Sequence, residues 1–284
     1  MIQAGLILEG GGMKGTYTAG VLDFFLEKNL EFSSCYGVSA GAVNLCSYLS
    51  KQKGRGYRSL TEYMGNSRIC GWHSLLTEGN IINSKFAYDL IPKYLLPFDS
   101  KTYERYEGKV FAVVTNVETG QAEYLSMKEA QQAMIAVQAS TALPLVSKIV
   151  NIDGKKYLDG GLADPIPIRK SVIDGNKKNI IILTKEEGYV RKAASNGSLI
   201  KLRYYKYPKI YEVMKDHHIS YNETMEYIKR LEKEGKAFVI QPKEKNNISR
   251  LEKDKNKMKV LYETGYQDAK NRYESLMNFL EKSI

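Results

Sequence analysis

Short apolar runs alternate with helix-like segments over the first fifty residues. Residues 5–9 (Gly-Leu-Ile-Leu-Glu) predict a short buried strand, and residues 35–38 predict a second one. Between them, a helix is predicted to end near Asn29, because apolar residues recur at a helical spacing, at Val21, Leu22, Phe25 and Leu26. Another helix is predicted from Ala40 to about Ser50. This order of strand, helix, strand and helix is typical of a parallel sheet in an α/β layered fold.

The middle of the chain adds further strands. Residues 109–115 predict a strand, and residues 122–125 predict a strand that returns antiparallel to it. Residues 127–138 predict a helix with its apolar positions on one face. Residues 179–184 (Asn-Ile-Ile-Ile-Leu-Thr) predict another fully buried strand.

A hairpin is predicted around Asp153-Gly154. Residues 148–152 and 155–158 flank this pair, which is a strong two-residue turn signal between strands. Asp159-Gly160-Gly161 follows the hairpin directly and would form a new turn. Residues 164–167 (Asp-Pro-Ile-Pro) then exclude a regular helix or a central strand.

The pattern divides the chain into a core over residues 1–185 and an extension over residues 186–284. We expect the extension to pack on the core. Its predicted elements are an amphipathic helix over 211–233, a strand over 237–240 and a long polar helix over 251–282. Within the core, residues 51–105 predict helices and loops that either cap a site or form ordinary peripheral packing.

Composition changes this picture mainly through charge. Apolar residues make up 43% of the chain, and Lys and Arg exceed Asp and Glu by ten, 42 against 32. The excess favours anionic partners, such as an acidic membrane surface, an anionic substrate or nucleic acid. No apolar run reaches the roughly 18 residues that a spanning helix needs, and the first residues lack the pattern of a signal peptide. Three cysteines without metal-like spacing indicate a reducing compartment, so we expect a cytoplasmic protein that associates peripherally with membranes.

The candidate nucleophile is Ser39. Residues 37–41 read Gly-Val-Ser-Ala-Gly, the Gly-x-Ser-x-Gly pattern of a nucleophile elbow. A strand that turns directly into a helix places the serine on a tight turn at the helix N-terminus, where partial positive charge favours a developing anion. Gly37 and Gly41 lack a Cβ, so neighbouring backbone can approach closely. An ordinary Gly/Ser turn is the alternative.

The glycine-rich loop at residues 10–15 has several interpretations. It matches the dinucleotide fingerprint Gly-x-Gly-x-x-Gly, but that site needs an acid at the end of the second strand, where Ser39 stands. A P-loop needs Gly-Lys-Ser/Thr, whereas residues 14–16 read Lys-Gly-Thr. An oxyanion hole built from exposed backbone N–H groups is the third interpretation, and a simple tight turn is the fourth. Lys14 at a helix start suggests a nearby carboxylate or an anionic substrate group.

Asp159 is the candidate partner of the serine. It follows a predicted strand and precedes two glycines, so its carboxylate could reach Ser39 directly. A carboxylate is a weak base for a hydroxyl unless burial raises its pKa and the site stabilises the anion. The three histidines are poor candidates: His73 is expected to lie at the surface or in packing, and His217-His218 lacks the spacing of a helical metal pair. We expect no metal and no cofactor.

Taken together, these motifs resemble the patatin-like phospholipase family, over roughly residues 5–185. They occur here in the family's order: the glycine loop with its lysine, Gly-x-Ser-x-Gly, and Asp-Gly-Gly. Residues 139–144 and 164–167 also resemble family segments. The resemblance implies a three-layer α/β/α fold with a mostly parallel sheet, and a Ser39–Asp159 dyad without histidine. It also implies an oxyanion hole in the loop Gly10, Gly11, Gly12, Met13, Lys14 and Gly15, with Gly37, Gly41, Gly160 and Gly161 shaping the two turns.

The sequence thus predicts a serine acyl hydrolase of the lipase or phospholipase A type that needs no cofactor and acts on a lipid or other ester. Two other classes stay open. One is an NAD(P)-binding oxidoreductase that uses the glycine loop, and the other is a non-enzymatic protein that binds surfaces through its positive charge. Nucleic acid is not an expected partner, and the oligomeric state is left open.

Overall fold

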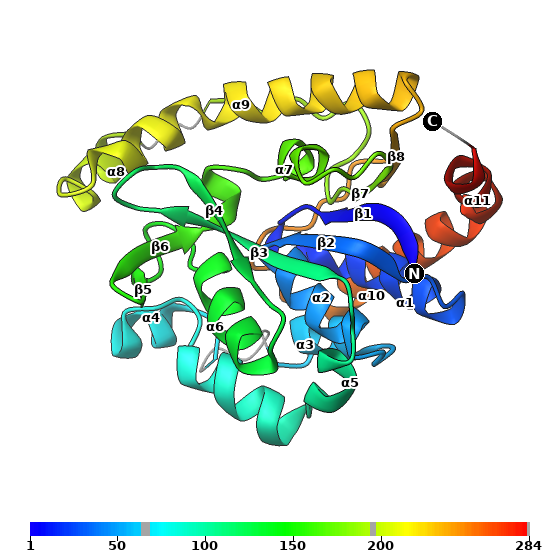
Figure 1. The fold of residues 1–284 in the computed structure, drawn as a ribbon. Coiled ribbons are helices and arrows are strands. Elements are labelled where there is room, and N and C mark those ends of the chain that lie inside the picture. Colours follow the sequence, from blue (N-terminus) through cyan, green and yellow to red (C-terminus); the bar gives the residue numbers. More distant parts are fainter. Residues whose placement is uncertain (64–68, 194–196, 283–284) are drawn as a thin grey trace.

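An eight-stranded sheet covered by helices on both faces forms the centre of the computed structural model (Figure 1). The structure describes residues 1–63, 69–193 and 197–282. Residues 64–68 of the predicted cap, and residues 194–196 and 283–284 of the predicted extension, lie outside the described residues. The α/β/α fold class with a mostly parallel sheet is confirmed.

The strand order is β5-β6-β3-β2-β1-β7-β8, and β4 pairs with β3 beside this path. Strands β3, β2, β1, β7 and β8 run parallel to one another, whereas β4 and β6 pair antiparallel with β3, and β5 pairs antiparallel with β6. The bounds are β1 (Ile2–Leu8), β2 (Phe32–Val38), β3 (Lys109–Asn116), β4 (Ala122–Ser126), β5 (Val150–Ile152), β6 (Lys155–Asp159), β7 (Asn179–Ile182) and β8 (Ala237–Ile240). The predicted return of β4 and the predicted hairpin at Asp153-Gly154 are both confirmed, and both turn residues have positive φ.

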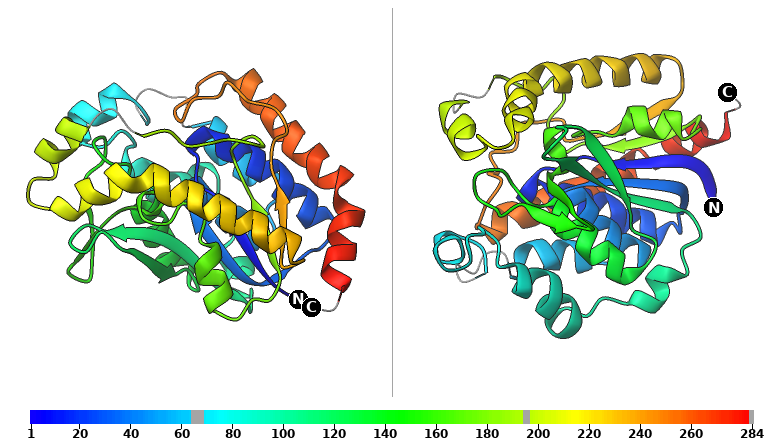
Figure 2. Two further views of the ribbon diagram at one scale, coloured as in Figure 1. Left: turned by 90° about the horizontal axis from the view of Figure 1, so that it is seen from above. Right: turned by 60° about the vertical axis from the view of Figure 1, so that its left-hand side comes forward.

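Helices cover the two faces of the sheet because its side chains alternate. Leu6 and Leu8 pack in the core beneath α1 (Gly15–Glu27), α2 (Ala40–Leu49), α6 (Ala130–Ser140) and α10 (Lys255–Asn271). Ile7 faces the opposite way, toward α7 (Ile168–Ile173) and α9 (Pro208–Lys233). Figure 2 shows α9 lying along one side of the molecule. Among the described helices, none combines the length and the apolar character needed to cross a bilayer.

The predicted cap region contains short helices and one buried arginine, Arg55. They are α3 (Arg55–Thr61), α4 (Trp72–Glu78), the π-helix η2 (Phe86–Leu95) and α5 (Ser100–Glu104). The Arg55 guanidinium donates to the carbonyl of Leu96 at 3.0 Å and to the hydroxyl of Ser47 at 3.1 Å. This side chain therefore ties the apolar run at residues 95–98 to the helix that follows the elbow.

The predicted long helix over residues 251–282 is wrong, because two helices occupy this part of the chain. The carboxylate of Asp254 accepts from the N–H groups of Asn256 and Lys257, so α10 starts only at Lys255. The chain then bends at Arg272, and α11 (Tyr273–Glu281) turns back toward the sheet. There Phe279 packs against Phe238 of β8, with ring centroids 5.6 Å apart. Burial of this aromatic pair favours the bend over a straight continuation.

Helices α1 and α10 approach closely through two glycines. A Cβ on Gly20 would lie 2.0 Å from the carbonyl oxygen of Tyr262, and one on Gly265 would lie 2.1 Å from that of Tyr17. The hydroxyl of Tyr17 also donates to Asp268 at 2.8 Å. The C-terminal region thus packs directly on the helix that follows the glycine loop. The proposed division at residue 185 stays a prediction.

Candidate active site

Ser39 lies at the turn between β2 and α2 in a strained conformation. Its backbone has φ 52° and ψ −119°, a region that side-chain-bearing residues rarely adopt and that costs on the order of 1–3 kcal/mol. The turn is held because the Ser39 N–H donates to the hydroxyl of Ser140 at 2.8 Å, and the Ser39 carbonyl accepts from Ala42 and Val43. Only 7% of Ser39 is exposed. The predicted strand–turn–helix context of the elbow is therefore present.

The flanking glycines make this turn possible by close approach. A Cβ on Gly37 would lie 2.7 Å from the backbone of Ala42, and one on Gly41 would lie 2.6 Å from the carbonyl oxygen of Leu8. Neither neighbour is a flexible side chain that could move aside. The Gly-x-Ser-x-Gly pattern thus has a direct steric cause.

Asp159 is brought to the elbow by strand β3. Val38, at the end of β2, pairs with Val113 of β3, and the next residue of β3, Val114, pairs with Asp159 at the end of β6. The backbone of Asp159 is fixed by its N–H, which donates to Ala142 at 2.9 Å. Two residues 120 positions apart in the sequence thereby line one cavity.

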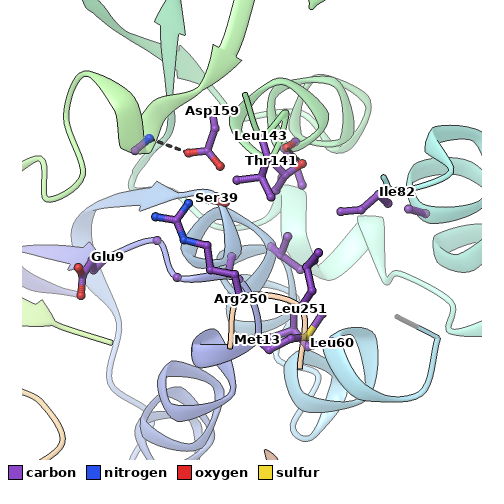
Figure 3. Close-up of a pocket in the computed structure, with 18 of the residues that line it drawn as sticks. Glu9, Met13, Ser39, Leu60, Ile82, Thr141, Leu143, Asp159, Arg250 and Leu251 are labelled. Atoms are coloured by element: carbon purple, nitrogen blue, oxygen red, sulfur yellow. Dashed lines mark hydrogen bonds between the residues drawn. The ribbon is translucent and has the colours of Figure 1, made fainter. Parts of the chain in front are cut away.

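The glycine after Asp159 is also needed for close approach. A Cβ on Gly160 would lie 2.1 Å from the carbonyl oxygen of Val113. The Gly161 N–H donates to the Asp159 carboxylate at 2.7 Å, so the side chain caps the short 3₁₀ helix η3 (Gly160–Leu162) and is held in one orientation (Figure 3).

Burial raises the pKa of the Asp159 carboxyl above its ordinary value. The hydrogen bond from the Gly161 N–H and the positive charge of Arg250 oppose this shift. Only 4% of Asp159 is exposed. A buried carboxylate with a raised pKa is a stronger base than an aspartate in water, which is the property a serine partner needs.

The glycine loop is anchored by Glu9, which is 1% exposed. One carboxylate oxygen accepts from the N–H of Thr184 at 2.6 Å, and the other accepts from the hydroxyl of Tyr221 at 2.9 Å. These bonds fix the end of β1 against β7 and α9. The loop is packed tightly beyond this point, because a Cβ on Gly11 would lie 2.6 Å from the Thr184 hydroxyl.

The predicted oxyanion donors differ in availability. The Met13 N–H donates to the carbonyl of Arg250 at 3.1 Å, and the N–H groups of Lys14 and Gly15 bond within the loop. Within the described part of the chain, the N–H groups of residues 10–12 have no such acceptor. Gly10 also lies against the nucleophile, since a Cβ there would be 3.2 Å from that of Ser39. The first three glycines of the loop are therefore the better candidates.

Lys14 is buried, but the structure pairs it with no carboxylate among the described residues. The sequence had suggested either a carboxylate or an anionic group of the substrate. Its charge instead acts on Lys185, whose pKa falls to about 8 through burial, through Lys14 and through two nearby arginines.

The cavity has a volume of about 360 Å³, and one side of it is apolar. Figure 3 shows Ser39 and Asp159 facing the cavity, with Leu60, Ile82, Leu143 and Leu251 on the side away from Glu9. Residues from the predicted cap region contribute part of this wall. The apolar lining includes Val43, Leu60, Ile82, Ile91, Met134, Val137, Leu143 and Leu251.

The other side of the cavity is cationic, and sequence reasoning missed it. Four residues line it: Lys185, Arg191, His217 and Arg250. Lys185 is the last residue of the predicted core, and the other three belong to the predicted extension. Only the rise in basic residues after position 185 pointed in this direction. His217 borders the cavity, a position that the sequence did not predict, whereas His73 is exposed on α4 as expected.

Two family models match the chain. The model described as "Patatin-like phospholipase" matches residues 6–171, and a domain of unknown function (DUF6363) matches residues 207–281. The uncharacterized protein YjjU of Escherichia coli (strain K12) is 29% identical over 183 residues, covering 63% of this chain and 51% of YjjU. The chain thus spans about half the length of this curated relative. The crystal structure of VipD from Legionella pneumophila aligns with a TM-score of 0.49 and 15% identity, over 96% of this chain and 67% of VipD.

Proposed function

The chain belongs to the patatin-like phospholipase family, and we propose that it hydrolyses carboxylic esters of lipids with Ser39 as nucleophile and Asp159 as general base. One observation carries the proposal. A serine on a strained elbow and a buried carboxylate line the same cavity, and the rest of that cavity offers an apolar wall to an acyl chain. The family match spans the glycine loop, the elbow and Asp-Gly-Gly.

In the first half of the reaction, the Ser39 hydroxyl oxygen attacks the ester carbonyl carbon while its proton passes to Asp159. The carbonyl oxygen becomes an oxyanion, which the N–H groups of Gly11 and Gly12 stabilise by hydrogen bonding. The tetrahedral intermediate collapses, the alcohol leaves with the proton from Asp159, and an acyl-serine remains. In the second half, Asp159 takes a proton from water as the water oxygen attacks the acyl carbon of the acyl-serine. The bond from the acyl carbon to the Ser39 oxygen then breaks, Asp159 returns the proton to that oxygen, and the carboxylic acid is released.

The two other classes raised by the sequence are supported less well. An oxidoreductase needs an acid for the ribose at the end of β2, and the residue there is Ser39, packed against Gly10. A non-enzymatic surface-binding protein has no need for a serine in a strained conformation beside a buried carboxylate.

A fluorophosphonate probe tests the proposal, because it forms a stable adduct only with an activated serine. We expect one adduct, mapped by peptide mass spectrometry to Ser39, and parallel turnover of p-nitrophenyl esters that increases with acyl length up to a medium chain. An adduct on another serine would identify that residue as the nucleophile instead of Ser39. Absence of any adduct in a protein that melts cooperatively would contradict a serine hydrolase.

We also propose that one end of the molecule contacts anionic membranes. Helix α4 exposes Trp72 and Leu76, at 76% and 84%, and α8 (Gly197–Arg203) exposes Leu202 at 75%. Both helices lie at the same end of the molecule (Figures 1 and 2). Basic residues stand among these apolar ones on and beside α8, at Lys201, Arg203 and Lys206. Exposed apolar and aromatic groups beside cations are typical of interfacial binding.

Co-sedimentation with vesicles measures this contact. Binding is expected to vesicles that contain an anionic lipid, to weaken as salt is raised, and to decrease in a Trp72→Glu, Leu202→Glu double variant. Exposed Ile219 on α9 provides a control substitution, Ile219→Glu, of the same kind at another place. If the double variant bound vesicles as well as the control variant does, the proposed membrane contact at this end of the molecule would be refuted.

A further inference from the structure

One segment of the C-terminal region packs against the glycine loop. This segment, the strap, is the connection over residues 241–254 between β8 and α10, and it contains neither helix nor strand. Connections longer than about 12 residues without secondary structure are uncommon in compact domains, and they are usually functional or disordered. The DUF6363 model covers the strap and both of its neighbours, whereas the patatin-like model ends at residue 171.

The strap is fixed to the rest of the molecule near both ends and in the middle. The carbonyl of Pro242 accepts from the N–H of Glu187 at 3.0 Å. Ile248 is buried in the same apolar core as Met13 of the glycine loop. At the far end, Asp254 caps α10, which packs closely on α1. The strap is therefore a tethered segment with a defined position.

Arg250 is the residue at which the strap meets the glycine loop. Its carbonyl oxygen accepts from the N–H of Met13 at 3.1 Å. A Cβ on Gly12 would lie 2.4 Å from the same oxygen, and Gly12 has a φ of 58°. Only glycine meets both conditions without strain. The strap thus packs directly on the loop that carries the proposed oxyanion donors.

The side chain of Arg250 lies near the reacting groups. It lines the cavity that holds Ser39 and Asp159, and Figure 3 shows it beside both. Burial raises the pKa of Asp159, and the positive charge of Arg250 opposes this effect. Within the described ranges the two side chains form no direct ion pair, so their attraction acts at longer range. A nearby cation favours the carboxylate, which is the form that accepts a proton.

We propose that the strap is part of the catalytic centre and that Arg250 is a positioning residue of the reaction. The carbonyl of Arg250 holds the glycine loop in its working conformation, and the guanidinium favours the charged form of Asp159. This role rests on the proposed function, and it assigns a part in the reaction to the region that matches the domain of unknown function. Neither effect requires a charged substrate.

A pH series of fluorophosphonate labelling tests the guanidinium. The probe is uncharged, so its rate of reaction with Ser39 reports on the catalytic groups and not on attraction of an anion. At acidic pH, where the rate falls, we expect Arg250→Gln to react about threefold more slowly than the unmodified protein, because less of Asp159 is charged. At higher pH the two rates should converge. Arg250→Lys keeps the charge and should restore the unmodified profile.

The matched control is Lys253→Gln. Lys253 is an exposed cation of the strap that is not among the described residues lining the cavity, so its variant should keep the unmodified profile. An unmodified profile in Arg250→Gln would overturn the role of the guanidinium, and so would an equal loss at every pH, which indicates a structural defect. The other charged or titratable groups of the lining stay the same in all variants, and they include Glu9, Arg55, Tyr88, Lys185, Arg191 and His217.

Amide hydrogen exchange tests the backbone contact. Ile248→Ala removes part of the strap's apolar anchor and leaves Arg250 in place. We expect faster exchange in the peptide over residues 10–16. Labelling of Ser39 at the pH of maximal rate should slow at least about tenfold, because a small displacement near the reacting atoms is costly. Ile228→Ala is the matched control, since it truncates the same side chain in the core on the opposite face of the sheet. It should lower the melting temperature without either change.

The results of the exchange experiment separate three cases. Exchange over residues 10–16 that matches the Ile228→Ala control overturns the strap's hold on the loop. Faster exchange with an unchanged labelling rate overturns its part in the reaction, and both changes together support it. If Ile248→Ala does not melt cooperatively, Ile248→Val and Ile228→Val provide the same comparison with a smaller truncation.

The exchange measurement does not depend on chemistry at Ser39. If the probe labels no serine in any variant, the nucleophile assignment fails, while faster exchange in Ile248→Ala still shows that the strap holds the loop. If Ser39 is labelled in all variants at the same rate and with the same pH profile, the nucleophile assignment stands and the role of the strap fails.

Discussion

Replacing Ser39 with alanine lowers kcat for ester hydrolysis by about 10⁴-fold or more, to the level of contaminating activity. The hydroxyl is the group that forms the covalent intermediate, and no neighbouring side chain of the elbow can replace it. The fold should survive, because alanine at φ 52° carries the same backbone strain as serine, and the N–H bond to Ser140 does not involve the side chain. The measurement is the initial rate on a medium-chain p-nitrophenyl ester, with labelling by the fluorophosphonate probe in parallel.

Ser220→Ala is the control for this substitution. Ser220 is an exposed residue of α9 outside the cavity lining, so its activity and labelling should match the unmodified protein. A Ser39→Ala protein that keeps more than about a tenth of the activity, with an unchanged melting temperature, would exclude Ser39 as the nucleophile.

Replacing Asp159 with asparagine is expected to lower kcat by about 10²- to 10⁴-fold, the usual range for loss of a general base. The asparagine oxygen can still accept from the Gly161 N–H, so the turn is kept while the base is lost. Activity is measured on the same ester and across pH. In the unmodified protein, kcat/KM should decrease as the pH is lowered. The midpoint of this decrease should lie above the ordinary aspartate pKa of about 3.9, because burial raises the pKa of Asp159.

The same substitution should stabilise the protein at neutral pH. The pKa of Asp159 is higher in the folded than in the unfolded state, so the folded state binds the proton more tightly. The resulting stabilisation is complete below the pKa that Asp159 has in the unfolded state, and it is lost as the pH rises through the pKa in the folded state. At pH 7 the buried carboxylate is therefore charged, and its burial destabilises the folded protein. Asparagine has no such charge. The melting temperature of Asp159→Asn should therefore exceed that of the unmodified protein at pH 7, and the difference should shrink as pH falls below the folded pKa.

Asp153→Asn is the matched control, since Asp153 is exposed in the hairpin turn and its positive φ suits asparagine as well. Its melting temperature should change little at either pH. A lower melting temperature for Asp159→Asn at pH 7 would show that the carboxylate stabilises the fold, against the argument from burial.

Features of the site that depend on residues adjacent in the sequence were predictable from the sequence alone. The elbow was predicted from Gly37 and Gly41, and the structure places backbone where their Cβ atoms would lie. The hairpin was predicted from Asp153-Gly154, because this pair adopts positive φ at low cost. Helix and strand types followed from apolar periodicity, but the position of the helix ends did not. The break at Arg272 depends on packing of Phe279 against a strand that is distant in the sequence.

The sequence by itself therefore determined the α/β fold class, the turn that carries Ser39 and the turn that carries Asp159. Each of these depends on steric effects and apolar periodicity among residues that are close in the sequence. Only the tertiary structure decided that β3 brings these turns to one cavity, that the Met13 N–H donates to the carbonyl of Arg250, and that cations from residue 185 onward gather beside Ser39. Such convergence depends on strand order and on contacts between distant segments. Neither leaves a signal in the spacing of residues along the chain.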